Sequence, residues 1–146
     1  MADTFVYVTY IRTTPEKLWE ALTKPEFQRV YWFGVILEST WDEGAPWKMI
    51  FKDGRVADTG EVLESKRPHR LVVSWRNEFR PELKEEGYAR CTFEIEIVHE
   101  AVKLTVIHEM DRPKSKLIES VSVGWPKILS NLKSLLENGK TFETLT

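Results

Sequence analysis

The spacing of hydrophobic and polar residues changes along the chain, and each spacing predicts a different element. Residues 5–12 are β-branched and aromatic, which is typical of a strand. Residues 13–16 combine threonine, proline and glutamate, a combination that starts helices because it satisfies free backbone N–H groups and suits the positive helix end. We expect this helix to end at Pro25 and a second short helical turn to follow over residues 25–31.

The middle of the chain alternates between apolar and polar residues, as half-buried antiparallel strands do. The clearest alternation places Cys91, Phe93, Ile95 and Ile97 on one face of a strand, with polar residues between them. Residues 77–87 interrupt the pattern with mixed charges and are expected to form a solvated loop. The strands predicted in this part of the chain are residues 46–52, 59–65, 70–76, 88–98 and 102–109.

Near the C-terminus the apolar residues recur every three or four positions, which indicates an amphipathic helix. Ile118, Val121 and Trp125 begin an apolar face that continues to Leu136, and the helix should stop near Gly139. Strands followed by a long helix predict an α+β fold with the helices on one face of an antiparallel sheet. Because helix and sheet each have one apolar face, the sheet must curve around the helix, which leaves a gap where a pocket can form.

Three segments resemble the START-like, helix-grip proteins. Residues 15–23 resemble the first helix of these proteins, and residues 58–62 with 68–75 are similar to their "G-x-V … P-x-x-L-x-x-x-W" strand pair. Residues 124–126, with the leucines that follow, look like the C-terminal helix. Over residues 5–138, the chain resembles the branch named after the activator of heat-shock protein 90 ATPase, and within that activator only the C-terminal domain.

The resemblance implies a helix-grip fold of the SRPBCC, or Bet v-type, superfamily. In this fold a curved antiparallel β-sheet wraps around a long C-terminal helix, two short helices follow the first strand, and a cavity lies between sheet and helix. Members of the superfamily bind lipids, sterols, polyketides or plant hormones, and some are cyclases. The activator contacts its chaperone through a separate N-terminal domain, so we do not read the family name as a function.

Length and charge favour one soluble domain over residues 1–146. The chain is 42% hydrophobic and 30% charged, as globular domains are, and its net charge of −2 argues against a nucleic-acid partner. No apolar run approaches the roughly 18–20 residues that a membrane span needs. Because Cys91 is the one cysteine and the N-terminus has no signal-peptide pattern, we expect a cytoplasmic protein.

Residue types that carry catalysis do not occur in their usual spacings. The three histidines form no spaced metal pair, no serine lies in a G-x-S-x-G elbow and the glycines are scattered, so we expect no catalytic residue, metal or cofactor. His69 and His99 fall in predicted turns. His108 is in phase with inward residues and should point toward the helix, either as a core histidine bonded to backbone or as a polar anchor in a cavity.

The aromatic content is the strongest hint of a binding site. Six tryptophans, seven phenylalanines and four tyrosines must pack somewhere, and the strand and helix phases point several of them toward one another. They either fill the core or line an apolar pocket. The residues expected at a ligand-binding site are Trp32, Phe33, Trp47, Met49, Trp75, Phe79, Phe93, His108, Val121 and Trp125.

Three classes of function remain open from the sequence. The leading hypothesis is a domain without enzymatic activity that binds a small apolar, lipid-like or aromatic molecule. The second is a protein-interaction module related to chaperones or stress, with a chaperone or other protein as partner and an exposed apolar patch. The third is a cyclase-type enzyme, which would need an acid–base group in the cavity, and His108 is the main candidate.

Overall fold

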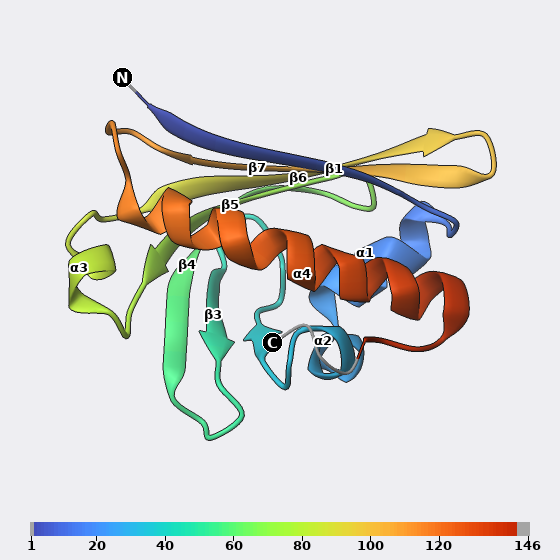
Figure 1. The fold of residues 1–146 in the computed structure, drawn as a ribbon, viewed down its shortest axis with the longest axis horizontal. Helices are drawn as coiled ribbons and strands as arrows, with labels where there is room; N and C mark the ends of the chain where they lie inside the picture. Colours follow the sequence, from blue (N-terminus) through green and yellow to red (C-terminus); the bar gives the residue numbers. More distant parts are fainter. Residues whose placement is uncertain (1, 143–146) are drawn as a thin grey trace.

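The computed structural model describes residues 2–142, which form an antiparallel sheet with a long helix packed against it (Figure 1). The strands are β1 (Asp3–Ile11), β2 (Ile36–Glu38), β3 (Pro46–Ile50), β4 (Val56–Lys66), β5 (Arg70–Asn77), β6 (Ala89–Val98) and β7 (Ala101–Met110). The helices are α1 (Pro15–Thr23), α2 (Pro25–Tyr31), α3 (Pro81–Lys84) and α4 (Lys116–Asn138).

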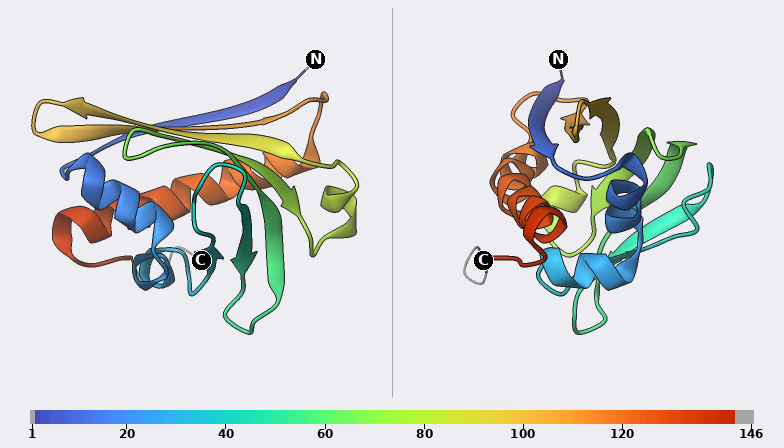
Figure 2. Two further views of the ribbon diagram at one scale, coloured as in Figure 1. Left: turned by 180° about the vertical axis from the view of Figure 1, so that it is seen from behind. Right: turned by 90° about the vertical axis from the view of Figure 1, so that its right-hand side faces the viewer.

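All neighbouring strands in this part of the chain are antiparallel, in the order β1-β7-β6-β5-β4-β3-β2. Figure 2 shows the sheet curving from β1 toward β3 and β4, with α4 on its concave side and α1 and α2 closing one end. The predicted α+β architecture, a curved sheet around a long C-terminal helix with two short helices after the first strand, is therefore confirmed.

Local capping explains where the helices begin and end. The Thr14 side chain accepts a hydrogen bond from the Lys17 backbone N at 3.2 Å, as the sequence predicts. At α4, Ser115 Oγ accepts from the Ile118 N at 3.1 Å, and Gly139 ends the helix with φ +76°. Within the described residues, no helix has both the length and the apolar composition needed to cross a membrane.

The predicted loop over residues 77–87 is wrong in part, because it contains α3. Arg80, Lys84 and Glu85 are exposed, but Leu83 is only 2% exposed and joins the core. Glu86 also ties this segment to α4, since its carboxylate accepts hydrogen bonds from Ser115 Oγ at 2.5 Å and the Lys116 N at 2.8 Å. A helix of one turn is too short to produce a readable hydrophobic period.

The inward phase predicted for β6 holds for Cys91, Phe93 and Ile95, which are buried, but not for Ile97. Ile97 is 66% exposed. β5 pairs with β6 only as far as Glu94, so beyond that residue β6 has β7 on one side and no described strand on the other. Alternation predicts which face a side chain is on, but not whether another element covers that face.

Candidate functional site

A cavity of about 300 Å³ opens between α4 and the concave face of the sheet. We call it the α4 cavity. It is formed by the segment after α2, by the inward faces of β3, β4 and β5, by the start of the α3 loop and by one face of α4. Its lining residues are Trp32, Phe33, Val35, Met49, Phe51, Ala57, Asp58, Trp75, Asn77, Phe79, Leu117, Ser120, Val121, Gly124, Trp125 and Ile128.

Six of the sixteen residues that line the α4 cavity are aromatic. The centroid of the Trp125 ring lies 5.4 Å from that of Trp32 and 5.8 Å from that of Trp75, so the three indoles form a continuous surface. Phe51 and Phe79 meet edge to face at 4.9 Å. Since Phe79 is exposed and the three indoles are buried, this pair lies toward solvent and the indoles lie deeper. Such walls suit an apolar or aromatic ligand.

Among the described residues, one acidic side chain lines this cavity, that of Asp58 on β4. It is 6% exposed, and its Oδ2 accepts a hydrogen bond from Trp75 Nε1 at 2.7 Å. Burial raises the pKa of the Asp58 carboxyl to about 6, and the negative charge of Glu78 acts in the same direction, while the Trp75 hydrogen bond opposes both. A carboxylate in an apolar cleft with a raised pKa is typical of binding and acid–base sites.

The other polar groups of the cavity are neutral. Asn77 Oδ1 accepts hydrogen bonds from the backbone N of Phe79 at 3.2 Å and of Arg80 at 2.9 Å, and thereby holds the chain that carries Phe79. Ser120 on α4 supplies a hydroxyl. Over residues 2–142, no lysine, arginine or histidine belongs to the lining. The described part of the chain also has no cluster of three or more acidic, histidine or cysteine side chains that could hold a metal ion.

The structure brings seven of the ten residues predicted at the site together around this cavity. These are Trp32, Phe33, Met49, Trp75, Phe79, Val121 and Trp125. Phe93, Trp47 and His108 are not among the lining residues. Phe93 points inward as expected, but it packs edge to face against Trp125, with the ring centroids 5.8 Å apart, and contributes to the core.

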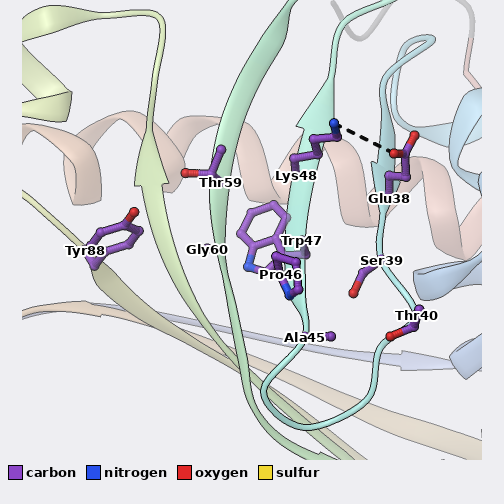
Figure 3. Close-up of a pocket in the computed structure, with 10 residues that line it drawn as sticks. All are labelled: Glu38, Ser39, Thr40, Ala45, Pro46, Trp47, Lys48, Thr59, Gly60 and Tyr88. Atoms are coloured by element: carbon purple, nitrogen blue, oxygen red, sulfur yellow. Dashed lines mark ion pairs between the residues drawn. The ribbon is translucent and has the colours of Figure 1, made fainter.

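Trp47 packs against Trp75, with ring centroids 4.7 Å apart, and its Nε1 donates to the Ser74 carbonyl at 2.8 Å. The Trp47 indole reaches that carbonyl by passing next to the Cα atom of Gly60. A Cβ added at Gly60 would lie 1.8 Å from the Ser74 oxygen, so only glycine fits at this position. Trp47 lines a different groove, of about 690 Å³ (Figure 3). In Figure 3, α4 lies behind β3 and β4 as seen from this groove, so the groove is on the side of these strands that faces away from α4.

His108 points toward α4, as its phase predicts, but the Trp125 side chain lines the α4 cavity and His108 does not. Its Nδ1 accepts a hydrogen bond from Trp125 Nε1 at 3.1 Å, so it is bonded to a side chain and not to backbone. Nε2 has no partner among the described residues. Burial lowers the pKa of His108 to about 3, which makes the ring neutral at pH 7.

Sequence reasoning misses Asp58 as a site residue. The alternation predicts a strand that begins at residue 59, whereas β4 begins at Val56. Once the strand includes Asp58, its spacing of four residues from Val62, which is fully buried, places both side chains on the inward face. An acidic residue in phase with buried residues is the signal that could have identified it.

Solved structures with the same fold cover nearly the whole chain. A protein from Mesorhizobium loti has a TM-score of 0.77 at 24% identity, over 92% of this chain and 96% of its own. A protein from Cytophaga hutchinsonii has a TM-score of 0.72 at 28% identity, over 93% and 94%. An HSP90 activator from Plasmodium falciparum has a TM-score of 0.73 at 21% identity, over 91% and 95%.

Comparison with curated proteins found no match. The sequence does match a protein family, described as "Activator of Hsp90 ATPase homolog 1-like protein", over residues 12–137. This match begins directly after β1 and ends in the last turn of α4, and therefore includes every residue that lines the α4 cavity. The chain thus belongs to the family of proteins like the activator of Hsp90 ATPase homolog 1.

Proposed function

We propose that the protein binds a small apolar or aromatic molecule in the α4 cavity. The observation that carries this proposal is the composition of the lining: three buried indoles and several aliphatic side chains line about 300 Å³, with one carboxylate among the described residues. That volume is at the lower end of the range for small-molecule sites, and mostly apolar walls with few polar groups are their usual composition. Asp58 replaces His108 as the proposed polar anchor, because Asp58 lines the cavity.

The same geometry weakens the cyclase-type alternative, which depends on His108. His108 lies behind Trp125 and its Nδ1 is already used as an acceptor. A ligand in the α4 cavity would therefore meet the Trp125 ring and not the imidazole. Binding needs no proton transfer, so it is the function that the lining residues support best.

Filling the cavity from α4 should abolish binding without unfolding the protein. Gly124 lines the cavity, and a Cβ built there meets only Ile128 Cδ1, at 4.0 Å. A leucine at this position would extend into the cavity, so Gly124→Leu should lose saturable binding of an apolar aromatic probe such as 4-phenylbutanol. Tryptophan fluorescence reports the binding because Trp32, Trp75 and Trp125 form the walls.

Gly124→Ala is the matched control, since it adds one methyl group in open space and should keep the binding. Both variants should be as stable as the original protein or more so, because glycine in a helix interior costs roughly 0.5–1 kcal/mol relative to alanine. Equal binding by the Gly124→Leu and Gly124→Ala variants would place the ligand elsewhere. Absence of saturable binding to any apolar probe by the unmodified chain would overturn the proposed function.

A second candidate function, protein interaction, is supported by the outer face of β1. Val6, Val8 and Tyr10 are 54%, 44% and 49% exposed on this strand, which is at the edge of the sheet. Exposed apolar residues on an edge strand are typical of a surface that pairs with another chain. The activator from Plasmodium falciparum, which has the same fold, makes an HSP90 chaperone the first partner to test.

If this surface binds HSP90, a Val6→Lys/Val8→Lys variant should lose binding to the purified chaperone by at least tenfold, because two charges would enter an apolar contact. Surface plasmon resonance with the purified chaperone measures the affinity. Ile97→Lys, an equally drastic change at an exposed residue of β6, two strands away from β1, controls for general effects of added charge. No binding of the unmodified chain to HSP90 would remove this candidate.

A further inference from the structure

We propose that the ligand of the α4 cavity carries a cationic amine, which Asp58 binds while the indoles enclose the group to which the amine is attached. This inference rests on the proposed function and names the chemical class of its ligand. It follows from three features of the cavity: a carboxylate without a cationic partner among the described residues, aromatic faces beside it, and the size of the space.

The first feature is the charge of Asp58. Trp75 Nε1 donates to Oδ2, and among the described residues no protein group donates to Oδ1. Within the same part of the chain, no cationic side chain lines the cavity. Buried charges in proteins are normally paired, and the hydrogen bond of one neutral indole does not neutralise a carboxylate. Because Asp58 lines the cavity, a cationic group of a ligand there can supply the missing partner.

The cations on β5 and α3, whose strand or loop lies beside Asp58, are already paired with another acid. Arg76 Nε lies 2.6 Å from Glu78 Oε2, and Lys84 Nζ lies 3.3 Å from Glu78 Oε1. Arg76 follows Trp75 on β5, so its side chain is on the outer face of the sheet. Glu78 itself adds negative charge near Asp58. Within the described part of the protein, Asp58 therefore has a negative charge nearby and no positive charge to balance its own. The positive charge would come from the ligand.

The second feature is the wall beside Asp58. Trp75 presents its N–H edge to the carboxylate, and the rings of Trp125 and Trp32 continue the wall from Trp75. The faces of indole rings attract cations, and tryptophan does so better than the other aromatic side chains. An anion would meet the carboxylate and the negative ring faces at once, so the same wall disfavours it.

The third feature is the volume. About 300 Å³ accommodates a molecule with one aromatic ring or a short alkyl chain, but not a large lipid or a polycyclic polyketide. The ligand class is thus a small hydrophobic amine, with the ammonium group at Asp58 and the apolar part between α4 and the sheet.

Three probes with the same phenyl-terminated four-carbon chain test this inference: 4-phenylbutylamine, 4-phenylbutanol and 4-phenylbutyrate. They are titrated at pH 7.5 into the unmodified chain and followed by tryptophan fluorescence and calorimetry. We expect the amine to bind about tenfold more tightly than the alcohol, since a hydrogen bond to a charged partner has roughly twice the strength of a neutral one, and the carboxylate to bind most weakly.

In the Asp58→Asn variant the preference for the amine over the alcohol should fall to about one, while the alcohol still binds. The amide oxygen that this substitution introduces can still accept the Trp75 hydrogen bond, so the cavity keeps its shape. Asp53→Asn is the matched control. It removes the same charge from an exposed turn, where Asp53 pairs with Arg55, and should keep the full preference.

The outcomes separate this inference from the proposed function. If the alcohol binds and the amine binds no better, the ligand class is wrong and the binding function stands. A preference that survives in the Asp58→Asn variant, or disappears in the Asp53→Asn variant, would also overturn the role of Asp58. If none of the three probes binds the unmodified chain, both the inference and the proposed function fail. Should the Asp58→Asn variant not fold, the ratio of the affinities in the unmodified chain decides.

Discussion

Replacing Trp125 with alanine should lower the free energy of unfolding by about 4 kcal/mol, near the upper end of the range for single core substitutions. Trp125 is buried on α4, and its ring contacts the rings of Trp32, Trp75 and Phe93. Its removal leaves a cavity that rigid neighbouring rings cannot fill. It also deprives buried His108 Nδ1 of its donor, which adds a desolvation cost.

Urea unfolding followed by far-UV circular dichroism measures this effect. The control on the same helix is Val123→Ala, which should change the stability by less than about 0.5 kcal/mol because Val123 is 61% exposed. Trp125→Phe separates the two contributions, since it keeps an aromatic ring but removes the N–H group; a loss of about 1–3 kcal/mol is expected from the unpaired His108 and the smaller ring. A small effect of Trp125→Ala would show that α4 is not anchored through this cluster.

The helix and strand periods predict the fold because each face of a helix or strand stays either buried or exposed along most of its length. α4 keeps buried apolar residues on one face from Leu117 to Leu132, and β1 alternates between exposed and covered side chains. The hydrophobic pattern misses α3 because its one turn contains a single buried residue, Leu83. The predictions therefore fail where an element is shorter than the period that would identify it.

For the candidate site, the sequence predicts only which side chains point toward the inside of the protein. Phase places Phe93 and Trp75 on the same side of the sheet, and in the structure both do point inward. Which of them meets the cavity depends on the position of Trp125, which covers Phe93 and leaves Trp75 accessible. Whether an inward side chain reaches the cavity or stays in the core depends on contacts between elements that are distant in the sequence. Hydrophobic spacing within one strand carries no information about these contacts.

The stability that His108 contributes should decrease as the pH falls, and this is the second large effect expected. An unfolded histidine has a pKa near 6.5 and takes up a proton on acidification, whereas burial keeps the pKa of folded His108 near 3. Between these values the unfolded state binds more protons, so acid favours unfolding, by about 1.4 kcal/mol for each pH unit.

Asp58 acts in the opposite direction and would conceal this effect in the unmodified chain. Burial raises its pKa from 3.8 to about 6, so between pH 6 and pH 4 the folded state binds the extra proton and acid stabilises it. The two changes nearly cancel in this range. A comparison of the unmodified chain with a His108→Asn variant removes the Asp58 contribution, because Asp58 is present in both proteins.

Asparagine at position 108 keeps a side-chain acceptor for Trp125 Nε1 but does not titrate. The stability of the unmodified chain relative to this variant should therefore fall by about 2 kcal/mol between pH 7 and pH 5, and by about 3 kcal/mol at pH 4. Urea unfolding at the three pH values measures it, and His99→Asn, in an exposed turn, controls for the loss of one histidine. If the difference between the unmodified chain and the His108→Asn variant does not change with pH, the folded protein protonates His108 as readily as the unfolded one, which is incompatible with a buried, neutral imidazole behind Trp125.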